Sequence, residues 1–261
     1  MFVAKVVEKV SASEFPDSVK QTAKQIADQL GTSPEIFISG ELNEDDQPKT
    51  GQSKVGGKPD VPASFKWPNE EEDEDAPLQF IAQLNLAEVH PHDLEGRLPA
   101  KGMVWLFSIA DGDRAYGYEI DSSTTKVVFM ANPGPLKPRA IPEVHADDED
   151  ATIEERKIDF GPIIGLDAFR DSGVKDVILE AMRELGGRSG PVFMLNQREA
   201  GSDDEAEDSG GTHGGFMLAD LDMHAIASNA FGEGILGFVL TAKDLAAGEL
   251  SNADTVFETG S

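Results

Sequence analysis

The sequence predicts an α+β protein: a single body built from two duplicated, pseudo-symmetric, strand-rich halves with a few helices. Eight segments have the length and composition of strands, whereas only two have helical spacing. One motif also recurs at a separation of about half the chain, which favours an internal duplication. The chain has 261 residues, so it is long enough to bury a large core without disulfides or metals.

The first half begins with an N-terminal helical region, residues 1–31. Within it, Pro16 and Asp17 suit the first turn of a helix that continues to Leu30. A short strand over residues 35–39 and a polar stretch over 40–66 follow. The strongest strand runs from Gly102 to Ile109, and its nearly continuous apolar composition predicts burial on both faces. Further strands are predicted over residues 78–86, 115–120 and 126–130.

The second half follows a proline-rich break, residues 133–142, and an acidic stretch. A helix is predicted from Asp171, as its N-cap, to Leu185, with Gly186 and Gly187 beyond its end. Strands are predicted over residues 191–196, 215–223 and 234–241. We therefore expect one domain, residues 1–261, with internal halves at about 32–132 and 158–258.

The repeat is carried by two similar segments, Ala82–Leu86 and Ala219–Met223. Each is followed by a spacer, a glycine and a strong strand. The repeat places polar residues on paired strands, where they would face each other across the two halves. Buried amides and carboxylates need hydrogen-bond partners, so these residues either lock the halves together, which we favour, or line a cleft. The candidate cleft residues are Gln83, Asn85, Asp220 and Asp222.

The charge is strongly negative, with 49 acidic and 22 basic residues and a net charge of −27. This balance argues against nucleic-acid binding, which depends on cationic neutralisation of phosphates, and against an anionic membrane surface. Four stretches hold 22 of the 49 acidic residues and contain no Lys or Arg. They are residues 41–46, 70–75, 143–155 and 203–208.

Three interpretations of these acidic stretches compete. Like charges repel and resist packing, so the stretches can be solvated loops without a role. They can also form a negative surface that steers a basic partner. A third interpretation, a structural protein adapted to high salt, predicts acid on every exposed face, whereas here the acid is clustered.

Several motifs resemble the YwqG-like family, also known as domain of unknown function DUF1963. The resemblance is carried by Ser53–Pro62, with its Gly-Gly-x-Pro element, by Trp67-Pro68, and by Phe80–Leu86, with its Phe-x-Ala-Gln-x-Asn-Leu element. It continues through Leu98–Phe107 and Gly234–Ser251, and covers residues 35 to 257. The resemblance implies an α+β fold built from a duplicated unit and no established reaction. Members of that family occur in bacterial gene neighbourhoods that include toxin and immunity genes, so the resemblance also implies, by association, an immunity-type or interaction role.

The search for chemistry predicts no catalytic residues, no metal site and no cofactor. The chain has no cysteine and no Gly-x-Ser-x-Gly elbow, so the usual activated nucleophiles are missing. His90-Pro91-His92 has two imidazoles but lacks a recognised zinc motif. The glycine-rich stretch 210–215 precedes a strand rather than a helix and has no Walker lysine. Without cysteines, a signal peptide or a long apolar segment, the chain is expected in the cytoplasm and not in a membrane.

The preferred hypothesis is a non-enzymatic protein-binding module whose acidic loops meet a basic protein, in the manner of a toxin-immunity protein. The alternative is a small-ligand binder or enzyme that uses a cleft between the halves. Trp67 lies in a polar loop, where we favour a structural plug over a binding anchor. The candidate partner-binding residues are Trp67, Glu70, Glu71, Glu72, Asp73, Glu74, Asp75, Asp203, Asp204 and Glu205.

Overall fold

Ten strands form one sheet in the computed structural model, which describes residues 2–12, 16–18, 20–21, 36–109, 120–146, 152–164, 172–195, 215–231 and 234–259. Their order is β12-β11-β10-β9-β1-β8-β2-β4-β5-β6, and neighbouring strands are antiparallel. A separate ladder joins β3 to β7. The strands are β1 (Ile36–Asn43), β2 (Lys54–Val55), β3 (Asp60–Val61), β4 (Gln79–Asn85), β5 (Met103–Ser108), β6 (Thr125–Met130), β7 (Lys137–Pro138), β8 (Arg156–Ile164), β9 (Val192–Met194), β10 (Phe216–Asp222), β11 (Gly234–Leu240) and β12 (Asp254–Thr259).

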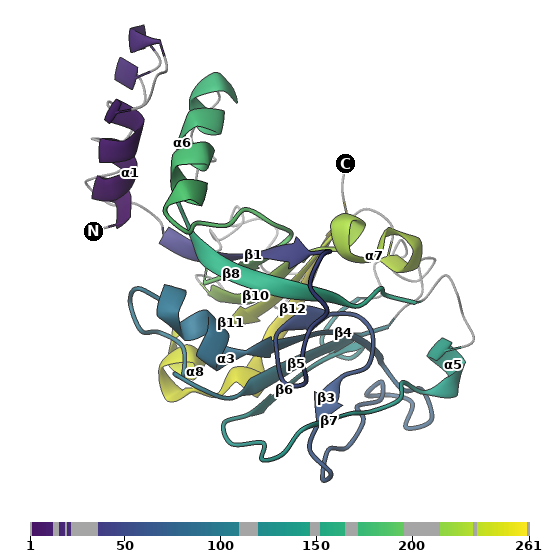
Figure 1. The fold of residues 1–261 in the computed structure, drawn as a ribbon. Coiled ribbons are helices and arrows are strands. Elements are labelled where there is room, and N and C mark those ends of the chain that lie inside the picture. Colours follow the sequence, from purple (N-terminus) through teal and green to yellow (C-terminus); the bar gives the residue numbers. More distant parts are fainter. Residues whose placement is uncertain are drawn as a thin grey trace, which may run out of the picture.

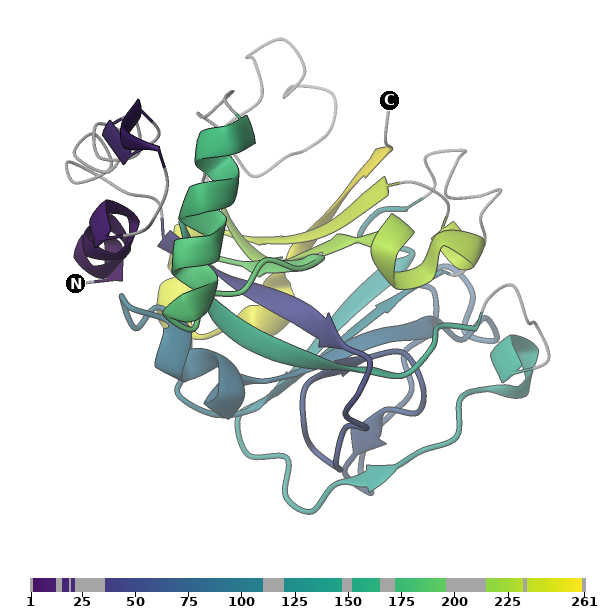
Figure 2. The same cartoon turned by 45° about the horizontal axis from the view of Figure 1, so that its top comes forward.

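The helices lie around the rim of this sheet. Two of them, α1 and α6, stand side by side at one end, next to β1 and β8 (Figures 1 and 2). Short helices follow β4, β10 and β11. The helices are α1 (Phe2–Ala12), α3 (Leu86–Val89), α5 (Glu143–Ala146), α6 (Ser172–Glu184), α7 (Met223–Phe231) and α8 (Ala242–Ala247), with 3-10 turns η1 (His90–His92) and η2 (Leu250–Asn252).

Two four-stranded meanders flank a central pair of strands. β2-β4-β5-β6 lies on one side of β8, and β9-β10-β11-β12 lies on the other side of β1. The second strand of each meander carries a register shift in its pairing with the third, between Phe80 and Ala82 in β4 and between Met217 and Ala219 in β10. A helix follows each of these strands. β1 borders the second meander and β8 the first, so each central strand pairs with the meander other than the one that directly follows it in the chain.

The two edge strands of the sheet come together, so that the sheet is nearly closed. The hydroxyl oxygens of Thr125 in β6 and Thr255 in β12 lie 2.6 Å apart. The backbone N–H of Phe129 donates to the hydroxyl of Ser251, at a distance of 3.0 Å. We call this contact of β6 with η2 and β12 the seam. Side-chain hydrogen bonds at the seam join the end of the first meander to the end of the second.

The main core runs through both meanders. All six residues of β5 are buried, and Trp105 and Phe107 are among the largest fully buried side chains, as the apolar composition of this segment predicts. A smaller apolar cluster joins α1 and α6 to the sheet through Val10, Ile163 and Ile178. An ion pair between Lys9 and Glu184 ties the two helices together at the surface.

The strand-rich class with a few helices is confirmed. The predicted strands at 78–86, 102–109, 126–130, 215–223 and 234–241 agree with β4, β5, β6, β10 and β11 to within a residue at each end, and the helix ending at Leu185 agrees with α6. The strand predicted at 35–39 extends to Asn43, and that at 191–196 is described over 192–194. The strand predicted at 115–120 lies outside the described residues except for its last position, and so does most of the helix predicted at 16–30.

The elements that were not predicted include α7, β12 and β8. The last is the most consequential, because β8 begins at Arg156, directly after the acidic stretch that the sequence marks as a boundary between halves. It pairs with β1 over eight residues and with β2 over two. The segment before β8 therefore leads straight into the centre of the sheet.

Candidate functional site

Gln83 is part of a buried polar network that holds the loop between β1 and β4 onto the sheet. Its side-chain oxygen accepts from the backbone N–H of Asp60 at 2.7 Å, and its amide nitrogen donates to Gln52 O and to Asp60 Oδ2 at 2.7 and 2.9 Å. Lys54 Nζ lies 3.6 Å from Asp60 Oδ2 and 2.7 Å from Glu155 Oε2. Asp60 is 1% exposed and Lys54 4%. Both polar atoms of the Gln83 side chain therefore form hydrogen bonds within the chain, and these bonds fix the loop to the sheet.

Asn85 and Asp222 occupy matching places at the ends of β4 and β10, where each caps a helix. The side-chain oxygen of Asn85 accepts from Ala87 N at 3.0 Å in the first turn of α3. Asp222 Oδ1 accepts from Ala225 N at 3.2 Å in the first turn of α7. These bonds satisfy backbone donors that a helix start leaves open.

The four candidate cleft residues are divided between β4, with Gln83 and Asn85, and β10, with Asp220 and Asp222. β4 and β10 are separated along the sheet by four strands, and Asp220 pairs across β10 with Phe193 and Gly237. None of the four lines the cavity between β6 and β12 or the cavity at the β3–β7 ladder. Their observed contacts are those of residues that hold elements together.

The segment Glu70–Asp75, which we call the acidic loop, is a well-fixed turn with outward carboxylates. Glu71 N donates to Ser123 O at 2.9 Å, Ala76 N donates to Asp73 O at 3.1 Å, and Asp75 N donates to Asp73 Oδ1 at 2.9 Å. Glu70 is half-buried, and residues 71–75 are all exposed. No ion pair joins the carboxylates of residues 71–75 to any described residue. The backbone of this loop is held while its negative charges face solvent.

Two other acidic stretches form ion pairs within the molecule, so their acids are not all left to solvent or to a partner. Glu41 lies 3.8 Å from Arg188, and Asp46 lies 3.8 Å from Lys157. Glu155, from the third stretch, pairs with Lys54. The reason is topological. Glu41 lies on β1 and Asp46 follows it, whereas Glu155 directly precedes β8. The cations lie on, or shortly before, strands that pair with β1 or β8: Lys157 is on β8, Lys54 on β2, and Arg188 precedes β9. The fourth stretch, with Asp203, Asp204 and Glu205, lies outside the described residues.

Lys157 and Asp159 reinforce this pairing on β8. Their charged groups are 2.7 Å apart. The hydrogen bond to Asp159, aided by the charges of Asp159 and Asp46, raises the pKa of Lys157. Partial burial acts to raise the pKa of Asp159, but hydrogen bonds from Asn43 and Lys157 outweigh it and lower that pKa below its ordinary value. Both groups are therefore held in their charged forms.

Trp67 packs as a half-buried cover over the core. Its indole N–H donates to Leu78 O at 2.8 Å, and its ring meets the Phe107 ring edge-on with centroids 5.4 Å apart. The guanidinium of Arg139 lies 5.5 Å from the centroid of the Trp67 ring. This placement is the structural one that the sequence favoured.

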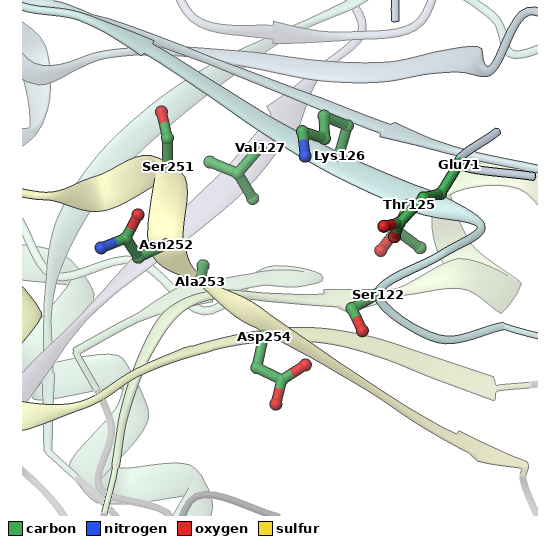
Figure 3. A pocket seen from close by; sticks show the side chains of 9 residues that line it. All are labelled: Glu71, Ser122, Thr125, Lys126, Val127, Ser251, Asn252, Ala253 and Asp254. Carbon is green, nitrogen blue, oxygen red and sulfur yellow. The ribbon is translucent and has the colours of Figure 1, made fainter. Parts of the chain in front are cut away.

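A pocket of about 310 Å³ opens at the seam, directly beside the acidic loop. We call it the seam pocket. Its walls come from three places: Glu71 of the acidic loop, β6 with the turn before it, and η2 with the start of β12 (Figure 3). The polar groups on these walls are one ammonium (Lys126), two carboxylates (Glu71 and Asp254), three hydroxyls and one amide. Sequence analysis did not identify this site, because it forms only where chain segments more than 120 residues apart meet.

No described histidine lines this pocket. His90 and His92 form η1, and burial, followed by the nearby charge of Arg188, lowers the pKa of His92 below its ordinary value. Within the described ranges, no group of three His, Asp or Glu side chains is placed to hold a metal ion. No helix in the same ranges is long and apolar enough to span a bilayer.

One protein family matches the chain. The sequence model described as "Domain of unknown function (DUF1963)" matches residues 53–257. That range begins at Ser53, whose hydroxyl accepts from Asn85 N, and ends in β12, so it includes both meanders, the acidic loop and the seam. No curated protein sequence matches the chain.

Proposed function

This chain belongs to the DUF1963 family, a domain of unknown function, and from that premise we propose that it is a protein-binding module whose acidic loop docks a basic partner protein. The observation that carries the proposal is the combination of a fixed backbone and unpaired charge in residues 71–75. A rigid loop loses little conformational entropy on binding. Its five carboxylates create a negative potential that accelerates encounter with a basic surface.

The seam pocket would supply affinity next to this steering surface. Exposed charges at the rim of an interface mainly change the association rate, whereas partly enclosed contacts change the dissociation rate. Glu71 belongs to both the loop and the pocket. A lysine or arginine side chain of the partner would enter between Glu71 and Asp254 and form charge-assisted hydrogen bonds there.

The concrete form of this function is an immunity-type role in the cytoplasm. Enzymes that bind nucleic acid carry basic surfaces because they must neutralise phosphates. An acidic protein that covers such a surface would inhibit the enzyme. The absence of cysteine in the sequence favours a reducing compartment for this role.

The proposal is tested by capture of proteins from a lysate of the source cell on the immobilised chain. The test variant neutralises the loop: Glu71, Glu72 and Glu74 become Gln, and Asp73 and Asp75 become Asn. The control variant makes the same charge change at exposed positions elsewhere, namely Glu8, Glu44, Asp45, Glu180 and Glu249.

We expect the native chain and the control variant to retain one or more basic proteins that the loop variant loses. Retention of the same proteins by all three chains, or of no basic protein by any of them, would contradict the proposal.

A second candidate function, a small-ligand site, is favoured by the position of the seam pocket. Its walls include the end of the first meander and the end of the second, so it is a cavity between the two halves of the chain. Its volume is at the lower end of the range typical of small-molecule sites, about 300 Å³. A zwitterionic molecule would suit walls that carry one ammonium and two carboxylates.

We also propose that the architecture is a duplicated unit within one domain, residues 1–261, with halves near 32–132 and 158–258. The palindromic order of the two meanders supports this, as do the register shifts at matching places in β4 and β10 and the matching helix caps, Asn85 and Asp222. Gly56 and Leu195, which directly follow β2 and β9, both have positive φ, of 61° and 64°. A positive φ is unusual for leucine.

A further inference from the structure

A second and larger cavity, of about 970 Å³, lies at the β3–β7 ladder, at the edge of the molecule that is lowest in Figure 1. It lies between a turn over residues 61–65 and the segment 133–140, and we call it the proline groove. Four proline rings, Phe65 and small side chains make most of its wall. Neither the proposed docking of a basic partner nor the seam pocket uses any of these residues.

The groove is preformed. Its two segments are joined by the β-bridges Asp60–Pro138 and Val61–Lys137 and by a hydrogen bond from Arg139 N to Pro59 O at 2.9 Å. Proline fixes the backbone φ angle, so the walls have little conformational freedom to lose. The ring of Phe65 meets that of Trp105 at a centroid distance of 5.3 Å, which anchors the floor to the main core.

The charge of the groove is opposite to that of the molecule. The residues that line it include Lys137 and Arg139 and no acid, in a chain of net charge −27. Neither cation forms an ion pair with a described residue. Arg139 is held in place, since its Nη1 donates to Phe65 O at 2.9 Å and its guanidinium lies over the Trp67 ring. A guanidinium has five N–H donors, so most of them are left for a ligand.

We propose that the proline groove binds an extended peptide segment of another protein in which acidic side chains alternate with proline or other apolar residues. Grooves lined by aromatic and apolar rings recognise polyproline-type peptides, which are already extended and lose little entropy on binding. Fixed Arg and Lys side chains add charge-assisted hydrogen bonds to carboxylates. Residues 137–140 are exposed along the rim, which lets a chain enter and leave at both ends of the groove.

The test uses a fluorescein-labelled peptide of four Glu-Pro repeats, with binding to the full chain followed by fluorescence anisotropy at about 150 mM salt. At that ionic strength charges more than about 8 Å apart are largely screened, so the acidic remainder of the molecule has little effect. Two comparison peptides, of four Lys-Pro and four Glu-Gly repeats, separate the charge requirement from the apolar one. We expect the Glu-Pro peptide to bind at least about tenfold more tightly than either.

Two variants localise the binding. Lys137→Glu reverses an exposed charge in the groove, and Ser64→Trp fills the groove from an exposed position without changing its charge. We expect Lys137→Glu to weaken binding of the Glu-Pro peptide about tenfold, the loss that corresponds to one charge-assisted hydrogen bond. Ser64→Trp should weaken it by about the same factor because the indole ring occupies the groove. The control, Lys243→Glu on α8, makes the same charge reversal away from the β3–β7 ladder in both views of the fold.

The proposal is overturned if the Lys-Pro or the Glu-Gly peptide binds as tightly as the Glu-Pro peptide. It is also overturned if both groove variants bind within twofold of the native chain, or if Lys243→Glu weakens binding as much as Lys137→Glu does. Because the two groove variants alter different exposed side chains, a folding defect in one leaves the other as a test. Loss of basic-partner binding by the acidic-loop variant bears only on the proposed function.

Discussion

Lys54 and Asp60 form a nearly buried pair, with 5% and 1% of their side chains exposed. Together with Gln83 and Glu155 they anchor the loop between β1 and β4 to the sheet. Buried charges are tolerated only when they are paired, and removal of one partner leaves the other uncompensated in a medium of low dielectric constant. The segment Lys54–Asp60 contains the Gly-Gly-x-Pro element, which turns the chain so that the two charges meet.

Lys54→Met should therefore destabilise the protein by about 3–5 kcal/mol, the range for breaking one side of a buried ion pair. The measurement is the free energy of unfolding in urea. Lys58→Met is the matched control, because Lys58 is exposed and a surface substitution of this kind costs within about 0.5 kcal/mol. Equal losses for the two variants would show that the buried pair does not hold the loop.

Because Asp159 and Lys157 stabilise the fold in their charged forms, the free energy of unfolding should depend on pH at both the acidic and the basic extreme. The folded-state pKa of Asp159 is lowered from 3.8, so its stabilisation is complete above that value and is lost as the pH falls through the folded pKa. The folded-state pKa of Lys157 is raised from 10.5, so its contribution is complete below that value and is lost as the pH rises through the folded pKa.

The variant Asp159→Asn should consequently differ most from the native chain in unfolding free energy between about pH 5 and 9, and the difference should shrink toward both extremes. Urea unfolding at a series of pH values measures this. A difference that stays constant down to about pH 2 would be inconsistent with a charge-based role for Asp159.

Asn85 and Asp222 are helix caps: Asn85 ends β4 and precedes α3, and Asp222 ends β10 and precedes α7. Asp222→Ala should cost about 1 kcal/mol, a typical value for loss of an N-cap, whereas Asp222→Asn keeps an acceptor and should cost much less. Asn85→Ala should cost more than Asp222→Ala, because Asn85 also donates to Gly51 O. Thermal unfolding of the three variants tests this, and a loss for Asp222→Asn as large as that for Asp222→Ala would refute the capping role.

Most elements with a strong apolar pattern could be predicted from the sequence. β5 is a nearly continuous apolar run and is buried throughout. β8 could not be predicted, because Gly161 and Pro162 interrupt it and its first half is charged. The neighbours of β8 explain both residues. An added Cβ at Gly161 would come within 2.4 Å of Gly186 O. The partner strand β2 ends before Pro162 is reached, so the missing N–H of this proline costs no hydrogen bond to β2.

The candidate site was predicted only in part. The acidic loop is local in sequence, and its charge run is visible without a structure. Which acids are already paired is not visible, since Glu41 meets Arg188 and Asp46 meets Lys157 across more than 100 residues. The hydrogen bonds of Gln83 with Asp60 and Gln52 were not visible in the sequence either.

At the scale of the whole molecule, some acidic side chains form ion pairs with cations of the same chain, whereas others face solvent. Residues of the first and third acidic stretches neutralise cations around β1 and β8, whereas the acidic loop keeps its charge outside. Arg139, whose guanidinium lies over the Trp67 ring, and Lys137 line the proline groove. The exposed acidic loop and the proline groove are thus made of different residues and carry opposite charges.

The central claim, that the acidic loop steers a basic partner, is tested most directly by the association rate constant between the purified chain and its captured partner as salt is raised from about 20 to 500 mM. The account predicts a steep fall in the rate for the native chain, because screening shortens the reach of the loop's field. The chain neutralised at residues 71–75 should associate slowly and respond little to salt. Identical rates and salt slopes for the two chains would contradict the claim.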